Sequence, residues 1–119
     1  MWSLRLSGRQ RQGQQWEQQA LGWLRAQGLV LVEENFCCRG GEIDLILRDG
    51  ATLVFVEVRQ RADEHYGGAL ASITPAKIRR LKHAASTYLL RFDTPPPCRF
   101  DVVAIDGAAP VWLQNVLDM

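Results

Sequence analysis

The sequence predicts an α/β protein with a central mixed sheet of four to five strands flanked by helices, in the order α-β-β-β-α-β. Two observations support this prediction. Apolar runs stand on both sides of Asp49-Gly50, a dipeptide typical of tight β-hairpins because both central positions of a type I′ turn need positive φ. A helix then begins at Thr74-Pro75 and precedes the mostly apolar segment 99–105, which suits an interior strand reached by a crossover.

Length and composition favour one ordinary globular domain. The chain has 119 residues, 47% of them apolar and 23% charged, and a chain of this size can bury a core without disulfides. We assign residues 1–12 to a flexible basic arm and residues 13–119 to a single domain.

Location follows from what the chain contains. The sequence has no apolar run of membrane-spanning length, and its N-terminus is too polar for a signal peptide, so we expect a cytoplasmic protein with no membrane contact. Cys37, Cys38 and Cys98 form no CxxC pair, and we expect reduced thiols in or near the core.

The two strands beside Asp49-Gly50 can be paired by counting outward from that loop. Glu42 then faces Glu57, Asp44 faces Phe55, and Asp44 and Glu57 are diagonal neighbours on one face. That polar face carries Glu42, Asp44, Glu57 and Arg59, and the apolar face carries Ile43, Leu45, Val54, Val56 and Val58.

Two carboxylates facing each other destabilise a hairpin, so Glu42 and Glu57 need a partner. A divalent cation would serve, because Mg²⁺ is held by oxygen ligands, often one or two carboxylates with water and phosphate. The alternative is a solvated face whose acids pair with Arg48, Arg59 or Arg61. We favour the metal because these acids stand within apolar strands.

The first helix, predicted for residues 14–27, carries an acid on its apolar stripe. Glu17 lies three and four residues before Ala20 and Leu21, so the three share one side of the helix. Glu17 either has a structural partner, such as a buried arginine or a cap, or reaches the carboxylate face of the hairpin as a metal ligand or water-positioning group. The spacing leaves both interpretations open.

The remaining elements complete the predicted sheet. Segment 29–37 forms a strand that makes a meander with the hairpin, with a bulge or a polar end at residues 33–35, and segment 111–113 forms a last edge strand. The helix from Thr74 places Lys77 in its first turn, beside the end of the third strand. Its buried stripe consists of Ile78, Leu81, Ala85, Tyr88 and Leu89.

Basic residues gather at two places, although the net charge is only +1. One cluster comprises Arg5, Arg9 and Arg11, and the other comprises Lys77, Arg79, Arg80, Lys82 and His83. Basic clusters around an acidic centre suit a polyanion, although solvated helix faces often look the same. Between strand and helix, His65, Tyr66 and the pair Gly67-Gly68 form a loop that a ligand could approach closely.

Five short segments together carry a family resemblance: Gly13-x-x-x-Glu17-x-x-Ala20, Arg39-Gly-Gly-Glu-Ile-Asp44, Phe55-Val-Glu57-Val-Arg59-x-Arg61, residues 67–77, and Arg99-Phe-Asp-Val-Val. With this order of elements, the chain resembles the PD-(D/E)xK, or restriction endonuclease-like, nuclease superfamily. Within it, the chain is similar to the YraN family of small, uncharacterised bacterial proteins, which resemble archaeal Holliday junction resolvases. The resemblance covers nearly the whole chain from Gly13.

The resemblance implies a role for each matching residue. Asp44 and Glu57 match the two metal-binding acids, Glu17 matches the acid of the first helix, and the Val58 carbonyl is an additional ligand. Arg59 stands where the superfamily usually has lysine. Because arginine stays protonated, it suits a phosphate contact better than general-base catalysis, so the metal would have to activate the water.

The expected function is that of an endonuclease dependent on Mg²⁺ or Mn²⁺ and acting on structured or branched DNA, with Glu17, Asp44, Glu57 and Arg59 as its catalytic residues. The predicted contacts to the DNA backbone are Arg61, Lys77, Arg79, Arg80 and Lys82. Symmetric cutting of two strands would favour a homodimer. Two alternatives keep the fold but not the chemistry: a nucleic-acid-binding protein with a degenerate site, and a protein-interaction module.

Overall fold

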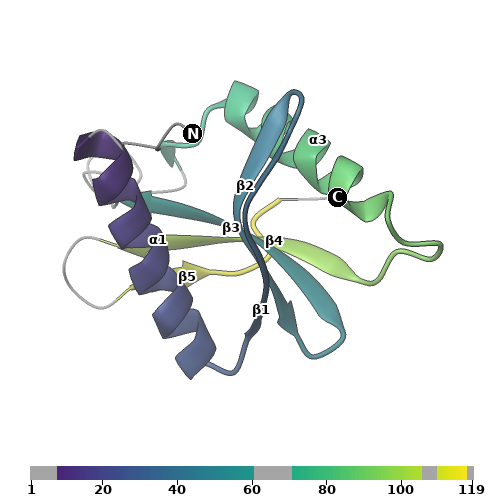
Figure 1. The fold of residues 1–119 in the computed structure, drawn as a ribbon, viewed down its shortest axis with the longest axis horizontal. Helices are drawn as coiled ribbons and strands as arrows, with labels where there is room; N and C mark the ends of the chain where they lie inside the picture. The colour runs from purple at the N-terminus through teal and green to yellow at the C-terminus, as the bar shows by residue number, and fades with distance from the viewer. Residues whose placement is uncertain (1–7, 61–70, 106–109, 118–119) are drawn as a thin grey trace, which may run out of the picture.

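The computed structural model, described for residues 8–60, 71–105 and 110–117, forms a five-stranded mixed sheet with helices on both faces (Figure 1). The elements are α1 (Gly8–Ala26), β1 (Val30–Cys38), β2 (Gly41–Asp49), β3 (Thr52–Gln60), α3 (Pro75–Leu89), β4 (Cys98–Ile105) and β5 (Val111–Leu113). This confirms the predicted fold class and the predicted order of elements, including the last strand.

The sheet has the strand order β1-β2-β3-β4-β5. Its pairs are antiparallel except that of β3 with β4, which is parallel. α3 lies within the long connection that a parallel pair requires. β4 is therefore an interior strand, as predicted, and it is buried from Phe100 to Ile105.

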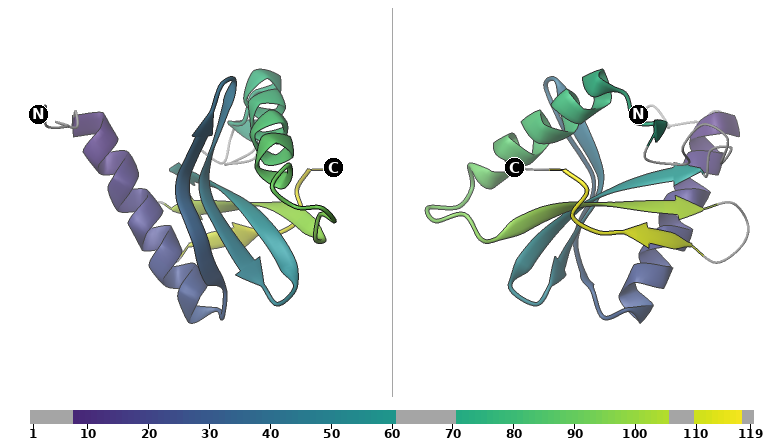
Figure 2. Two further views of the ribbon diagram at one scale, coloured as in Figure 1. Left: turned by 45° about the vertical axis from the view of Figure 1, so that its right-hand side comes forward. Right: turned by 180° about the vertical axis from the view of Figure 1, so that it is seen from behind.

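Two apolar layers hold the helices to opposite faces of the sheet (Figure 2). On one face the α1 residues Ala20, Leu21 and Leu24 pack on Leu45, Leu47, Val54 and Val56. On the other face the α3 residues Leu81, Ala84, Ala85 and Tyr88 pack on Ile46, Leu53, Phe55 and Phe100. The alternation of the two central strands thus supplies one layer to each helix.

Ile43 departs from the predicted alternation. It belongs to the α3 layer, together with Phe36 of the neighbouring strand, and not to the α1 layer with Leu45. The pairing of β2 with β3 ends at Leu45, and beyond that point β2 pairs with β1 alone. Gly41 at this end packs so closely on α3 that a Cβ would collide with the Arg80 carbonyl oxygen.

The predicted hairpin register is wrong by two residues. Asp49 pairs with Thr52, so the loop is Gly50-Ala51 and not Asp49-Gly50. Gly50 adopts φ +60°, the left-handed region that favours glycine. Asp49 stays in the strand because its carboxylate Oδ2 accepts a hydrogen bond from Arg99 Nη2 at 3.0 Å. A shift of two residues leaves the paired residues of the hairpin, from Leu45 onward in β2, on their predicted faces, whereas Ile43 lies beyond the paired part.

The helix boundaries are partly as predicted. α3 begins as expected: Thr74 Oγ1 accepts the Lys77 backbone N–H at 3.1 Å, and Pro75 is its first residue. α1 begins at Gly8, six residues before the predicted start, so residues 8–12 of the predicted arm are helical. Residues 1–7 lie outside the described part of the chain.

β1 contains the irregularity that its polar centre predicted. The register with β2 shifts between Leu31 and Glu33, and Asn35 has φ +51°. Cys37 is exposed, which corrects the prediction of a core thiol, whereas Cys38 and Cys98 are half-buried. The free state of all three thiols is as predicted.

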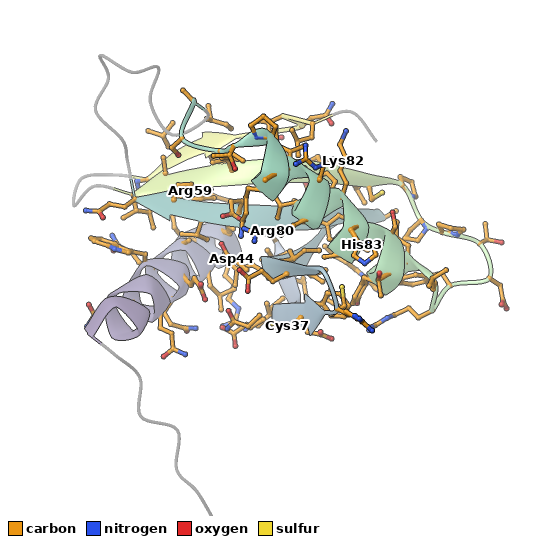
Figure 3. All side chains as sticks on the ribbon, turned by 90° about the horizontal axis from the view of Figure 1, so that it is seen from above. Cys37, Asp44, Arg59, Arg80, Lys82 and His83 are labelled. Carbon is orange, nitrogen blue, oxygen red and sulfur yellow. The ribbon has the colours of Figure 1, made fainter. Side chains whose placement is uncertain are left out.

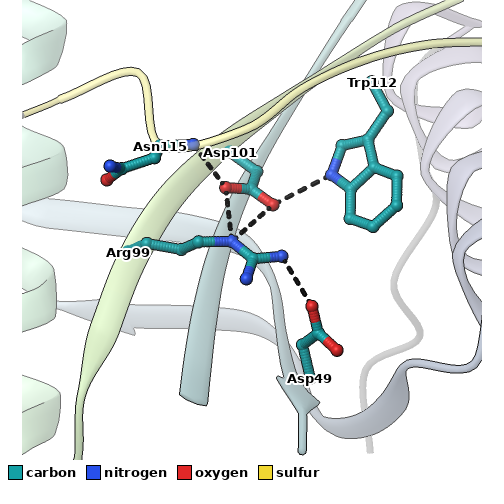
Figure 4. Close-up of polar contacts among 5 residues, drawn as sticks. All are labelled: Asp49, Arg99, Asp101, Trp112 and Asn115. Atoms are coloured by element: carbon teal, nitrogen blue, oxygen red, sulfur yellow. Dashed lines mark hydrogen bonds and ion pairs between the residues drawn. The ribbon is translucent and has the colours of Figure 1, made fainter.

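A buried polar network joins the end of the chain to β4 (Figure 4). Asp101 is 1% exposed and accepts hydrogen bonds from Arg99 Nε at 3.0 and 3.2 Å. It also accepts one from Trp112 Nε1 and one from the Asn115 backbone, each at 2.9 Å. A buried carboxylate with this many donors is satisfied, so the network fastens β5 and the segment after it.

Candidate functional site

Asp44 and Glu57 come from neighbouring strands and lie close together where β2 and β3 stop pairing. Continuing the observed register by one residue places them opposite each other. Asp44 Oδ2 accepts a hydrogen bond from the Val58 backbone N–H at 2.9 Å, so it reaches the residue that follows Glu57. Glu57 is 5% exposed. The structure therefore brings these two predicted site residues together.

Burial makes both acids hard to ionise. The pKa of Glu57 is raised to about 8, mainly by burial and also by the charge of Asp44, against the attraction of Lys77 and Arg59. Burial also raises the pKa of Asp44, while the hydrogen bond from Val58 and the charge of Lys77 oppose the rise. Two such groups bind a cation readily, because a cation offsets both the desolvation and the repulsion.

Glu17 of α1 extends this acidic pair. Burial and the charge of Asp44 raise the pKa of Glu17 to about 7, and a side-chain hydrogen bond to Asp44 adds to the rise. A hydrogen bond from Asn35 opposes it. Of the two interpretations left open for Glu17, the structure favours the second, because it places the Glu17 side chain beside Asp44.

Lys77 occupies the position where a cation was expected between Glu42 and Glu57. Its Nζ lies 3.4 Å from Glu42 Oε1 and 3.8 Å from Glu57 Oε1, and its side chain is only 13% exposed. The predicted pairing of Glu42 with Glu57 is wrong, because the shifted register sets Glu42 across from Arg59. The argument for a metal between those two acids therefore fails, since an ammonium group from α3 already serves both.

Arg59 approaches the site from the end of β3. Its Nε lies 3.5 Å from Glu57 Oε1, and its side chain is 28% exposed. Arg59 Nε and Glu57 Oε2 are both buried and have no hydrogen-bond partner among the described residues. A buried polar atom without a partner is costly in a folded protein, so each of these atoms requires an explanation.

The residues present fit a divalent cation held by two carboxylates. In the described part of the chain, no group of three or more His, Cys, Asp or Glu side chains is arranged to hold a metal ion. Glu57 Oε2, however, is a buried acceptor that has no hydrogen-bond donor among the described residues, and a cation could take the place of that donor. Mg²⁺ commonly takes one or two carboxylates and completes its shell with water and phosphate, and Asp44 and Glu57 match that pattern.

The exposed cations of α3 form a basic rim, which we define as Arg79, Arg80, Lys82 and His83. Figure 3 shows Arg80, Lys82 and His83 along the helix, with Asp44 and Arg59 on the neighbouring strands. His83 Nε2 lies 2.9 Å from the Arg39 carbonyl oxygen. A shallow hollow of about 380 Å³ is lined by Gly40, Ala76 and three members of the rim, Arg79, Arg80 and His83.

Lys77 is separate from that rim, although the sequence grouped it with Arg79, Arg80 and Lys82. Its predicted place beside the end of β3 is correct, but its ammonium points at the acids. The signal was its spacing: Lys77 lies four residues before Leu81, on the stripe that faces the sheet. Arg61, His65, Tyr66 and Gly67-Gly68 lie outside the described residues.

The described helices include none with the length and apolar character needed to cross a membrane.

A model of the uncharacterised protein family UPF0102 matches residues 16–105. A UPF0102 protein of Herminiimonas arsenicoxydans is 55% identical over 112 residues, which cover 94% of this chain and 90% of that one.

Two further relatives agree. A UPF0102 protein of Nitrosomonas eutropha is 51% identical over 114 residues, covering 95% of this chain and 98% of its own. One of Alkalilimnicola ehrlichii is 57% identical over 105 residues, covering 87% and 83%. The family part of the predicted resemblance, YraN, is thereby confirmed: the chain belongs to the UPF0102 family.

Proposed function

We propose that this protein is a nuclease-like protein that uses Mg²⁺ or Mn²⁺ and acts on structured or branched DNA. The observation that carries the proposal is the buried acid Glu57, one oxygen of which has no hydrogen-bond partner among the described residues, beside the half-buried Asp44. Buried acids with raised pKa values are typical of sites that bind a cation or move a proton. The PD-(D/E)xK resemblance supports the same assignment.

Each residue of the site has a role in this proposal. Asp44 and Glu57 hold the metal. The Val58 N–H points toward Asp44, and in a strand the carbonyl of the same residue points to the same side, so the Val58 carbonyl also faces Asp44. Glu17, whose pKa is raised to about 7, positions a water and can accept its proton near neutral pH. Arg59 contacts the phosphate. The bound ion would act as a Lewis acid on that phosphate.

The basic rim supplies the DNA contacts. Arg79, Arg80 and Lys82 are exposed on α3, the helix that also brings Lys77 to the acids. A phosphate backbone held along these side chains would be fixed in position without any reading of its base sequence. Preference for branched DNA would come from shape and from two copies of the chain acting together.

A second candidate is DNA binding without cleavage. Its support is Arg59, which stands where a lysine would serve the chemistry and whose Nε lies 3.5 Å from Glu57 Oε1. An interaction module is favoured less, because Glu57 is buried and Asp44 is half-buried, so they cannot form an exposed acidic docking face. Only Glu42 of that group is well exposed.

The test is an assay on four-way junction DNA with Mg²⁺, Mn²⁺ or a chelator. We expect metal-dependent cleavage by the native protein and none by Asp44→Asn or Glu57→Gln. Glu33→Gln, a surface acid on β1 with a side chain 38% exposed, is the matched control and should behave as the native protein. DNA that is retarded in the gel but not cut would support the second candidate. If the DNA is neither retarded nor cut, nucleic-acid binding is rejected altogether.

A further inference from the structure

Lys77 holds two carboxylates at once from a nearly enclosed position. Its Nζ lies 3.4 Å from Glu42 Oε1 and 3.8 Å from Glu57 Oε1. The side chain is 13% exposed, whereas that of Glu42 is 58% exposed. The ammonium therefore lies on the solvent side of Glu57. It gives this buried acid a positive charge from outside its own strand, β3.

The backbone of Lys77 is fixed, but its ammonium is not. Thr74 caps the first turn of α3 through the Lys77 N–H, which holds the Cα in place. A lysine ammonium sits on a flexible four-carbon stem and is strongly hydrated, so it can leave for solvent without disturbing the helix. The first turn of a helix has no preceding turn to block that movement.

The acid that Lys77 serves has a second, unused acceptor. Glu57 is 5% exposed. Its Oε2 has no hydrogen-bond partner among the described residues, whereas its Oε1 faces Lys77. A divalent ion on Oε2 would lie close to the ammonium, because both oxygens belong to one carboxylate. Like charges at such short range repel strongly where water is largely excluded.

We propose that Lys77 is the resident counter-ion of the carboxylate site, and that a divalent cation and the Lys77 ammonium exclude each other there. This inference rests on the proposed function, since it needs the metal to bind at Asp44 and Glu57. Metal binding would then free Lys77 from Glu57, and the affinity for the metal would be set partly by the cost of displacing it. Removing the ammonium should therefore strengthen metal binding.

The experiment is a calorimetric titration of Mg²⁺ into the DNA-free protein, repeated at increasing pH until the affinity of each variant no longer changes, because loss of the Lys77 charge raises the pKa of Glu57 and Asp44 further. We expect Lys77→Met to bind Mg²⁺ at least about fivefold more tightly than the native protein, because one repelling charge is gone. Lys77→Arg keeps the charge and should bind no more tightly. Arg48→Met, at an exposed basic residue near the opposite end of β2 from Gly41, should match the native protein.

The possible outcomes separate this inference from the function on which it rests. If the native protein and Asp44→Asn respond to Mg²⁺ alike, the metal site itself is wrong. If Asp44→Asn abolishes binding but Lys77→Met leaves the affinity unchanged or weaker, the site stands and the counter-ion role is overturned. Tighter binding by Lys77→Arg would also overturn it, because side-chain shape and not charge would then be responsible. Circular dichroism of each variant confirms that α3 is intact.

Discussion

Asp44 Oδ2 accepts the backbone N–H of Val58 at 2.9 Å, just beyond the point where β2 and β3 stop pairing. A side chain thus takes the place of a strand carbonyl. The same carboxylate that we assign to the metal also satisfies a backbone donor, so its structural and functional contributions must be separated by the choice of substitution.

Asp44→Asn and Asp44→Ala should differ in stability but agree in metal response. The asparagine side chain keeps an oxygen for the Val58 N–H, whereas alanine leaves that donor unpaired, at a cost of about 1–3 kcal/mol. Both variants lose a carboxylate ligand, so Mn²⁺ should raise the melting temperature of neither. Urea unfolding and a thermal shift with Mn²⁺ measure the two effects; a stable Asp44→Ala protein would show that the hydrogen bond matters little.

Glu57 should make the metal-free protein less stable as the pH rises. Its pKa increases from 4.5 to about 8 on folding, so between these values the folded state binds more protons than the unfolded state. The free energy of unfolding must then fall with rising pH across that interval. Glu57→Gln should remove part of the fall, on the order of 1 to 3 kcal/mol after allowance for residual solvent access.

Urea unfolding at a series of pH values, with a chelator present, measures this slope. Glu33→Gln provides the control, because its side chain is 38% exposed and lies outside the site. Equal slopes for Glu57→Gln and the native protein would contradict the burial of an ionisable group at this position. Added Mg²⁺ should flatten the slope of the native protein, because it favours the ionised acids.

Gly41 and Gly22 form a matched pair of glycine substitutions. A Cβ at Gly41 would collide with the Arg80 carbonyl oxygen and lie 3.1 Å from Ala84 Cβ, whereas nothing lies within 4 Å of one at Gly22. Gly41→Ala should therefore cost about 1–3 kcal/mol by forcing β2 away from α3. Gly22→Ala, in the interior of α1, should stabilise by about 0.5–1 kcal/mol.

The separation of β2 from α3 also predicts a functional effect. Glu42 follows Gly41 directly and pairs with Lys77 on the same helix. Because Gly41→Ala loosens the contact of Lys77 with the acids, we expect it to strengthen metal binding while it lowers stability, and we expect Gly22→Ala to leave metal binding unchanged. Both can be followed by urea unfolding and calorimetry; a Gly41→Ala protein of native stability would mean that this end of the hairpin can move at little cost.

Asp101 should be a structural acid with no part in metal binding. It is 1% exposed and accepts hydrogen bonds from Arg99, Trp112 and Asn115. Asp101→Ala leaves the half-buried Arg99 with Asp49 as its carboxylate partner and removes the acceptor of Trp112 Nε1 and the Asn115 N–H, which should cost about 1–3 kcal/mol. Trp112→Phe removes one of these hydrogen bonds and should cost about 1 kcal/mol. Mg²⁺ should still stabilise Trp112→Phe as much as the native protein, and a lost response would extend the site to β5.

The basic rim should determine how DNA binding responds to salt. Arg80→Ala should lower the slope of log K against log salt by about 0.9, as expected for one lost phosphate contact. Arg48→Ala is the control, because Arg48 is exposed near the opposite end of β2 from Gly41. Fluorescence anisotropy with labelled junction DNA gives both slopes. Equal slopes for the two variants would mean that the DNA does not bind along α3.

Local patterns were enough to predict the sheet and the closeness of Asp44 and Glu57, because the alternation of the paired part of the hairpin survives a register error of two residues. They could not predict the register itself. Asp49 is held in its strand by Arg99, fifty residues later in the chain. A turn rule that sees only Asp49-Gly50 has no access to that contact, which tertiary structure alone creates.

The sequence predicted that the site needs a cation, and the structure shows that an unexpected side chain supplies it. Counting along the hairpin indicated a charge between Glu42 and Glu57, but only the packing of α3 on the sheet shows that Lys77 supplies it. Glu17 was similarly placed on the correct helical stripe, while its contact with Asp44 depends on how α1 crosses β2. Helix orientation is a property of the packed core and not of local sequence.

The irregular pairing of β1 has a consequence for encounters between molecules. β1 is an outer strand, and an unprotected outer strand can recruit the same strand of another molecule and begin fibril growth. The shift between Leu31 and Glu33 breaks its repeat, and Glu33 and Glu34 add like charges that oppose self-pairing. Two copies of this protein would therefore be expected to associate through a helix or a loop, and crowding should not extend the sheet from one molecule into the next.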